Sequence, residues 1–440
     1  MRFISRSPVY NLKAVLNETG LKADVLRAWE RRYGLPTPER TAGGHRLYSE
    51  YDVETIKWLH ARQAEGLSIS RATELWHELI EAGRDPLTEY GSTGTMMVSD
   101  PSQEDTRLSS FREEWLNANM AFDSMKADEV LNQAFALYPV EIVCKEILQR
   151  GLSTMGEYWY QDKATVQQEH FATAQAIRRL DSLITATPNP TIEKTVLVGC
   201  PPGEWHSFPV LLLTLFLRRR GLDAVYLGAN IPIEQLVETM DSIKPDMIVM
   251  AAQRLPSAAS LLFAAFTLRK KDIIFGYGGQ IFNRIPELRE QIPGIYLGDT
   301  IEGSLFEIER LLTIPNPSQT AARVTETRED LVELYRENRP LIETELYKIM
   351  EIHNGEIDHF QTANEFFGDE LIAAMALGNP AYMEADLEWV QKLMTRRRIP
   401  AKELIPYLIA YREAVGKVIG REGAIITKWI SDFIAKNDSQ

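Results

Sequence analysis

His206 stands in a pattern that suits metal chemistry, with Glu204 two residues before it and Ser207 directly after it. A neutral imidazole is a good ligand for a transition metal. A nearby carboxylate can accept the other ring N–H, which fixes the tautomer and makes the ligating nitrogen more basic. The pattern therefore predicts His206 as a metal ligand and Glu204 as the residue that orients it.

The elements around this pattern indicate how it is positioned. Short apolar runs alternate with helical stretches between residues 189 and 315, and the runs are Val196–Gly199, Ala224–Leu227, Met247–Met250, Ile273–Tyr277 and Ile295–Leu297. Such alternation predicts a parallel, doubly wound sheet of the Rossmann type. Ligands bind at the carboxyl ends of strands in open α/β sheets, so His206 lies where a ligand is expected. Gly278 and Gly279, after the fourth run, let the backbone approach a bulky ligand.

The rest of the chain is predicted to be helical. Residues 1–80 read as a small head, 81–108 as a linker, 109–188 as a four-helix bundle, and 325–440 as an all-α domain after a second linker. The expected fold class is therefore multidomain α and α/β. With two cysteines, no signal-peptide pattern and no run of roughly 18 apolar residues, we expect a cytoplasmic protein without a disulfide framework or membrane span.

The head carries a local excess of positive charge. The formal net charge of the chain is −14, yet five arginines and only two glutamates lie between residues 27 and 46. Asn11–Glu18 and Lys22–Tyr33 read as two helices joined by a tight turn, and residues 41–48 suit a β-wing. One small basic face on an acidic protein indicates a dedicated DNA-contacting module.

The stretch from Val25 to Leu59 strongly resembles the winged helix-turn-helix head of the MerR family, and most closely its light-responsive CarH/LitR-like branch. The resemblance implies double-stranded operator DNA as a partner. It also implies assembly into a dimer or tetramer, because such heads bind palindromic sites. The DNA-contacting residues that it implies are Arg27, Arg31, Arg32, Tyr33, His45 and Arg46.

Residues 110–312 resemble the cobalamin-binding domains, in which the histidine of the His206 position is the lower axial ligand of cobalt. Trp159, followed after nine residues by Glu169-His170, resembles the motif of the CarH-type photoreceptors, in which these residues pack around a 5′-deoxyadenosyl upper ligand. The alternative is a core tryptophan with an exposed Glu and His. Three positions depart from the family pattern. Pro209 replaces a glycine, the serine expected after the third strand is missing so that Ser257 is the candidate substitute, and Tyr160 replaces a cobalt-binding histidine.

These resemblances imply a non-enzymatic regulator with adenosylcobalamin as the favoured cofactor and light as the signal. A cobalamin regulator that senses ligand level or redox state is the main alternative, and a corrinoid methyl carrier is a further one. For residues 325–440 we expect either an oligomerisation or partner domain, or a sensor that holds a haem or bilin. The candidate residues for such a pocket are His353, His359, Phe360, Phe366, Phe367 and Trp389.

Overall fold

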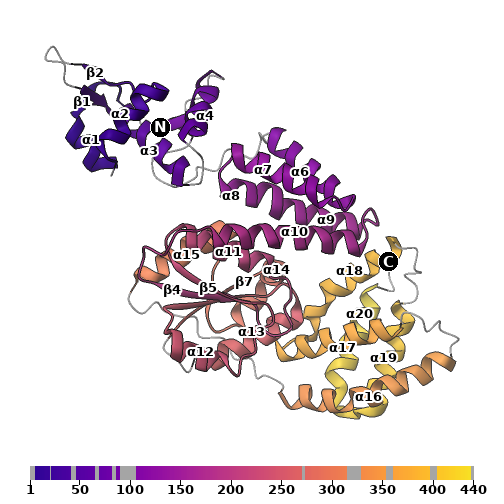
Figure 1. The fold of residues 1–440 in the computed structure, drawn as a ribbon. Coiled ribbons are helices and arrows are strands. Elements are labelled where there is room, and N and C mark those ends of the chain that lie inside the picture. The colour runs from indigo at the N-terminus through magenta and orange to yellow at the C-terminus, as the bar shows by residue number, and fades with distance from the viewer. Residues whose placement is uncertain are drawn as a thin grey trace. The chain divides into compact units, whose positions relative to one another are not determined.

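The computed structural model describes residues 5–19, 21–40, 46–64, 69–81, 86–89, 106–269, 273–314, 329–352, 360–396 and 404–437 (Figure 1). The chain divides into two compact units, Met1–Gly156 and Glu157–Gln440. Each unit is described by itself below. His45, His353 and His359, the second expected linker and most of the first lie outside the described residues, but residues 86–89 within the first expected linker form a short helix.

The head of the first unit is a winged helix-turn-helix. Its elements are β1 (Pro8–Asn11), α1 (Leu12–Thr19), α2 (Ala23–Tyr33), β2 (Glu39–Arg40), β3 (Arg46–Ser49), α3 (Glu50–Ala64), α4 (Ile69–Glu81) and α5 (Pro86–Glu89). The three strands form an antiparallel sheet in the order β1-β3-β2. A capping box begins α3, because Ser49 Oγ accepts from the Asp52 N–H and Asp52 Oδ2 accepts from the Ser49 N–H.

The remainder of the first unit is helical. It contains α6 (Thr106–Met120), α7 (Ser124–Leu137), α8 (Val140–Val143), the π-helical turn η1 (Cys144–Gln149) and most of α9 (Arg150–Tyr160). Trp115 on α6 is fully buried, and a side chain at Gly151 would collide with its ring, at 2.8 Å from Cζ3. Gly151 therefore permits the close approach of α9 to α6 within this unit.

The second unit begins at the end of α9 and continues into α10 (Val166–Thr185) and a parallel sheet. The strands are β4 (Thr195–Gly199), β5 (Asp223–Gly228), β6 (Met247–Ala251), β7 (Ile274–Gly278) and β8 (Ile295–Tyr296), in the order β5-β4-β6-β7-β8. The accompanying helices are α11 (Phe208–Arg219), α12 (Leu236–Ile243), α13 (Leu255–Leu268), α14 (Gln280–Arg284), η2 (Pro286–Glu290) and α15 (Ile301–Thr313). The strand order reverses between β4 and β6, which creates a topological switch point there.

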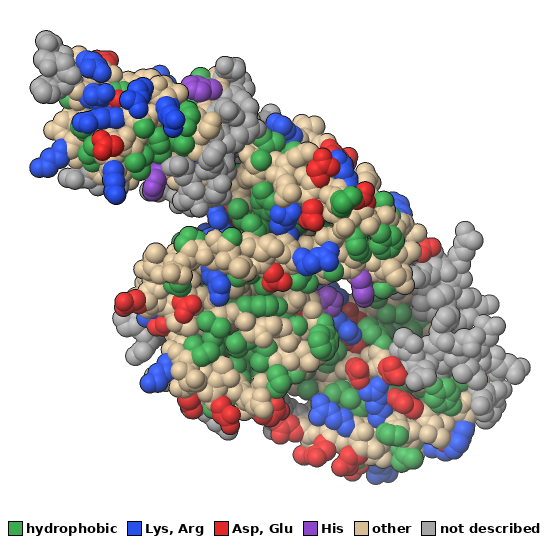
Figure 2. Space-filling view, viewed as in Figure 1, with side chains coloured by type: hydrophobic (Ala, Val, Ile, Leu, Met, Phe, Trp, Pro, Cys, Tyr) green, Lys and Arg blue, Asp and Glu red, His purple; other side chains and the backbone are tan. Residues whose placement is uncertain are grey.

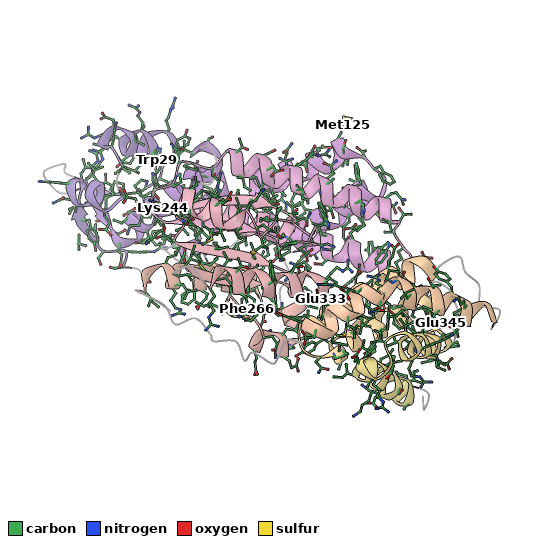
Figure 3. The ribbon with its side chains drawn as sticks, turned by 90° about the horizontal axis from the view of Figure 1, so that it is seen from below. Trp29, Met125, Lys244, Phe266, Glu333 and Glu345 are labelled. Carbon is green, nitrogen blue, oxygen red and sulfur yellow. The ribbon has the colours of Figure 1, made fainter. Side chains whose placement is uncertain are left out.

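The C-terminal part of the second unit is all-helical. It consists of α16 (Glu329–Ile352), α17 (Phe360–Ala376), η3 (Pro380–Met383), α18 (Glu384–Arg396), α19 (Leu404–Val418), η5 (Gly420–Gly423) and α20 (Ala424–Asn437). Its buried side chains join those of the sheet domain in one hydrophobic cluster, in which α13 packs on α17. Phe266 of α13 and Glu333 of α16, labelled in Figure 3, lie on helices that border this junction.

The expected fold class, multidomain α and α/β, is confirmed. Each of the five predicted strands overlaps an observed one, because short apolar runs bounded by loops are typical of strands buried on both faces. No helix in the described part of the chain combines the length and hydrophobicity that a membrane span requires.

Candidate functional site

The loop after β4 holds His206 by a short, local set of hydrogen bonds. Nδ1 of His206 lies 2.7 Å from Oε1 of Glu204, and the same oxygen accepts from the His206 backbone N–H at 2.9 Å. The carboxylate therefore accepts the Nδ1 proton and leaves Nε2 as the lone-pair nitrogen. The His206 side chain is 63% exposed, and no described residue forms a hydrogen bond to its Nε2. This is the tautomer and accessibility that a metal ligand needs.

Glu204 is fixed from its other side by residues that follow β6. Its side chain is 1% exposed, and Oε2 accepts from the Ser257 hydroxyl at 2.7 Å and from the Gln253 backbone N–H at 2.6 Å. Burial alone raises the pKa of a carboxyl group, but the hydrogen bonds from His206, Ser257 and Gln253 outweigh burial and lower the pKa of Glu204 to about 2. Glu204 is thus a permanently ionised, rigid acceptor.

The two loops that meet at Glu204 flank the switch point of the sheet. The hydrogen bond to Glu204 raises the pKa of His206, and the negative charge of Glu169 raises it further. Burial and the positive charge of Arg254 lower it. His206 therefore lies within electrostatic reach of Arg254, beside the start of α13, and of Glu169 on α10. Figure 2 shows histidine side chains beside a hollow on this face of the molecule.

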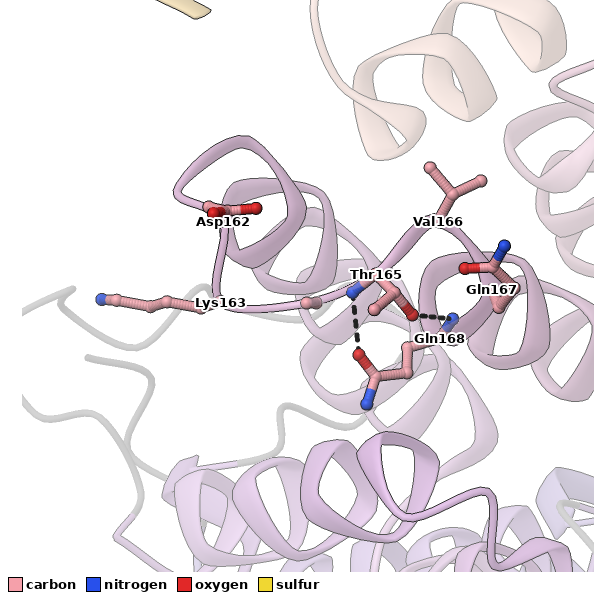
Figure 4. Close-up of a pocket in the computed structure, with 7 residues that line it drawn as sticks. Asp162, Lys163, Thr165, Val166, Gln167 and Gln168 are labelled. Atoms are coloured by element: carbon pink, nitrogen blue, oxygen red, sulfur yellow. Dashed lines mark hydrogen bonds between the residues drawn. The ribbon is translucent and has the colours of Figure 1, made fainter. Parts of the chain in front are cut away.

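Trp159 and Glu169 lie on either side of a tight loop. Thr165 caps α10 by a capping box with Gln168, with hydrogen bonds of 3.2 Å and 2.8 Å (Figure 4). Residues 162–168 line a pocket of about 310 Å³, the small end of the range for ligand pockets. Glu169 accepts from Thr173 Oγ1 at 2.9 Å, and its Oε2 lies 2.7 Å from Nδ1 of the exposed His170. A carboxylate with two oxygens keeps capacity for further hydroxyl donors.

The remaining predicted cofactor residues lie at the carboxyl edge of the sheet. Ser207 lies close enough to the Tyr226 hydroxyl on β5 to lower its pKa, against the rise that burial causes. A Cβ at Gly278 would meet nothing within 4 Å, so the backbone is open to a ligand there. A Cβ at Gly279, which has φ +118°, would lie 2.0 Å from the Ala252 carbonyl oxygen. Gly279 is therefore required by the contact between the ends of β7 and β6, in addition to any ligand contact.

In the head, three of the six predicted DNA-contacting residues lie on the outer face of α2. Arg27, Arg31 and Arg32 are exposed, while Leu26 and Trp29 are buried on the opposite face. Figure 2 shows Lys and Arg side chains gathered over this part of the molecule. Tyr33 is half-buried and packs against the core of the head. Exposed cations on one helix face suit the phosphates and base edges of a major groove.

Arg46 differs from the other arginines because it is held within the head. Its Nε donates to Glu30 Oε2 at 2.7 Å, and Tyr48 donates to the other oxygen of the same carboxylate at 2.6 Å. The Arg46 side chain is 27% exposed and ties strand β3 to helix α2. We therefore assign Arg46 a structural role, and its contact with DNA stays a prediction.

Comparison with known proteins agrees with this geometry. Residues 10–79 match the MerR HTH regulatory protein family, and residues 112–184 and 194–304 each match a B12 binding domain. The chain is 33% identical over 239 residues to the HTH-type transcriptional repressor CarH of Myxococcus xanthus, covering 54% of this chain and 77% of that protein. This chain belongs to the CarH family of HTH-type transcriptional repressors. The family assignment, with both B12 binding domains, establishes a MerR-type, cobalamin-binding transcriptional regulator.

Other relatives extend the comparison. The HTH-type transcriptional repressor CarA of Myxococcus xanthus is 28% identical over 246 residues, which cover 55% of this chain and 76% of CarA. Among solved structures, the monomethylamine corrinoid protein of Methanosarcina barkeri aligns over 47% of this chain and 100% of its own, with 18% identity and a TM-score of 0.39.

The residues of the site fit a cobalamin. The donor set is a single exposed imidazole nitrogen backed by a buried carboxylate, which is what a cobalt ion already held by a macrocycle requires of the protein. Gly203, Gly228 and Gly278 also leave open space above their Cα atoms along this edge. Sequence reasoning found His206 and Glu204 and named Ser257 as a substitute, but it missed Gln253 and Arg254, for which no local motif exists.

Among the described residues, the aromatic side chains expected to line a haem or bilin pocket do not converge. Phe367 packs on Tyr407 and Tyr411 in the core, Phe366 lies against Arg254 with the guanidinium 5.7 Å from its ring centre, and Trp389 stacks on Trp159. The Phe360 side chain lies outside the described residues. The described rings therefore serve core packing and contacts with the cofactor domain.

Proposed function

We propose that this regulator is light-responsive and that photolysis of bound adenosylcobalamin controls its assembly and its hold on operator DNA. The observation that supports the proposal is that Glu204 holds His206 with its Nε2 exposed, while the charge of Glu169 acts on the same imidazole. His206, backed by Glu204, provides a lower ligand, and the charge of Glu169 on α10 reaches the same imidazole. We propose that Glu169 and Trp159 lie on the upper side of the cofactor, as the resemblance to the CarH-type motif implies. When bound, adenosylcobalamin supplies a cobalt–carbon bond that light cleaves.

We propose that the protein responds to light because the upper ligand favours one of two arrangements of α9 and α10. Trp159 provides an aromatic plane and Glu169 provides an acceptor for sugar hydroxyls, so both favour one arrangement of α9 and α10 while the upper ligand is present. Loss of the ligand removes those contacts and therefore the bias. We propose that in the dark state the protomers form a dimer or tetramer whose heads bind DNA through Arg27, Arg31, Arg32, Tyr33, His45 and Arg46.

The test is a set of visible absorption spectra of protein loaded with adenosylcobalamin, recorded before and after green light. The wild type is expected to change its spectrum on illumination. His206→Ala is expected to weaken cobalamin binding, and Trp159→Ala to retain binding while altering the light-induced change. Unchanged spectra in both variants would refute the assignment of the two residues.

A second candidate function is a cobalamin regulator that responds to ligand level or redox state without light. The observation that favours it is Tyr160, which stacks on Trp389 with ring centres 5.6 Å apart and planes at 18°. Tyr160 is thus engaged in packing and is a phenol where the CarH-type pattern has an imidazole. Cobalamin binding without any spectral response to light would select this second function.

A further inference from the structure

The C-terminal helices reach both sides of the candidate cofactor site. Helix α17 contacts Arg254, which stands beside the residues that hold Glu204, and helix α18 contacts Trp159 and its neighbour Tyr160. The matched B12 binding domains lie within residues 112–304, so both helices are additional to them. A domain that contacts Arg254, next to the residue whose N–H holds Glu204, and also Trp159 is placed to affect the ligand itself.

On the lower-ligand side, α17 is held against Arg254 by an ion pair with a buried residue. Nη2 of Arg254 donates to Glu370 Oε1 at 3.1 Å, and Glu370 is 2% exposed. A second ion pair joins Arg284, at the end of α14, to Asp386 on α18 at 2.6 Å. Because Glu370 and Asp386 are both buried, removal of either arginine would leave a buried carboxyl group without this partner, and the pairs fix where α17 and α18 dock.

The contact on the upper-ligand side is an aromatic stack. The Trp389 ring lies 6.1 Å from the Trp159 ring with an interplanar angle of 27°, and it also stacks on Tyr160. Trp389 is 37% exposed, so it is a surface ring rather than a core residue. Near-parallel aromatic rings with an open side can accept another planar group, such as a nucleobase, by stacking.

We propose that Trp389 is a further ligand-binding residue, which α18 adds to the upper-ligand side of the cobalamin site beside Trp159. This inference rests on the proposed function, because it assumes that Trp159 faces the upper ligand. The C-terminal domain then acts as a wall of the pocket that favours a large upper ligand with a planar base over a small one. The two ion pairs are the anchors that hold α18 in this position.

The experiment compares the affinity of the full chain for adenosylcobalamin and hydroxocobalamin in the dark, by titration followed by visible absorption. Trp389→Leu removes the aromatic ring but keeps an apolar side chain, and Trp389→Phe keeps a ring. Leu341→Ala, an exposed apolar position on α16, is the matched control. We expect Trp389→Leu to weaken adenosylcobalamin binding roughly three- to tenfold, the size of one aromatic stack, and to leave hydroxocobalamin within about twofold.

The remaining variants decide between a ligand contact and domain packing. Trp389→Phe and Leu341→Ala are expected to bind both cobalamins as the wild type does. Equal loss of both cobalamins in Trp389→Leu, or no loss of either, would overturn the inference while leaving the proposed function intact. Failure of the wild type to bind either cobalamin would instead overturn the proposed function, and the inference with it.

Discussion

Replacement of Glu204 by glutamine tests the lower-ligand geometry most sharply. The carboxylate accepts hydrogen bonds from the ring and backbone of His206, the Ser257 hydroxyl and the Gln253 N–H. An amide of the same shape keeps one acceptor oxygen but turns an NH₂ group toward donors, so at least one buried donor loses its partner. The expected cost in the free energy of unfolding is about 1–3 kcal/mol.

The lowered pKa of Glu204 gives a second magnitude that rests on the same hydrogen bonds. A pKa of about 2, against an ordinary value of 4.5, corresponds to a preference of about 3 kcal/mol for the ionised carboxylate in the folded protein. Because the folded pKa lies below the unfolded one, this stabilisation is complete above about pH 4.5 and is lost as the pH falls toward 2. Glu204→Gln should therefore lose the acid-dependent part of the stability that the wild type shows in this window.

The assay is cobalamin affinity in the dark, followed by visible absorption at neutral pH. Loss of a carboxylate that orients a metal-bound histidine typically lowers affinity 10–100-fold, and we expect Glu204→Gln to fall in that range. Glu238→Gln, an exposed position on α12, is the matched control and should bind as the wild type. An affinity of Glu204→Gln equal to that of the wild type would refute the reasoning. So would a large further loss when Glu204→Gln is added to His206→Ala, because Glu204 is argued to act through His206.

Three other predictions concern the head and the anchor of the C-terminal domain. Arg31→Ala should weaken binding to duplex DNA and lower the slope of log affinity against log salt by about one, measured by fluorescence anisotropy; an unchanged slope would exclude a phosphate contact. Arg46→Ala should lower thermal stability by about 1 kcal/mol, because it breaks the pair with Glu30, and calorimetry showing no shift would contradict this. Burial and nearby Asp386 raise the pKa of Glu370 to about 7, so the wild type should lose stability as the pH rises from about 4.5 through 7. Glu370→Gln should flatten that loss, whereas parallel pH profiles of melting temperature would argue against it.

Short-range patterns made much of the site predictable. His206 and Glu204 are two residues apart, and the apolar run before them identified the strand whose end they follow. The order of strands was not contained in that local pattern, so the switch point between β4 and β6 became visible only in the sheet. Ser257 was foreseen only as a substitute, because its bond to Glu204 spans 53 residues of sequence.

The C-terminal domain shows what local patterns cannot supply. Phe366 and Phe367 are adjacent, so on a helix they point about 100° apart, and one meets Arg254 while the other enters the core. Their residue type and closeness in sequence placed both rings in one expected pocket, but the tertiary packing separates them. The same limit applies to Arg46, whose charge suggested DNA and whose carboxylate partner in α2 is set by the fold of the wing.

The central claim is that light acting on bound adenosylcobalamin controls assembly. The most direct measurement is size-exclusion chromatography with absorption detection on protein loaded with adenosylcobalamin in the dark and then exposed to green light. The account predicts a dimer or tetramer in the dark, and a changed cobalamin spectrum with a smaller assembly after illumination. A cobalamin-bound protein whose absorption spectrum and assembly size both stay unchanged on illumination would contradict this claim.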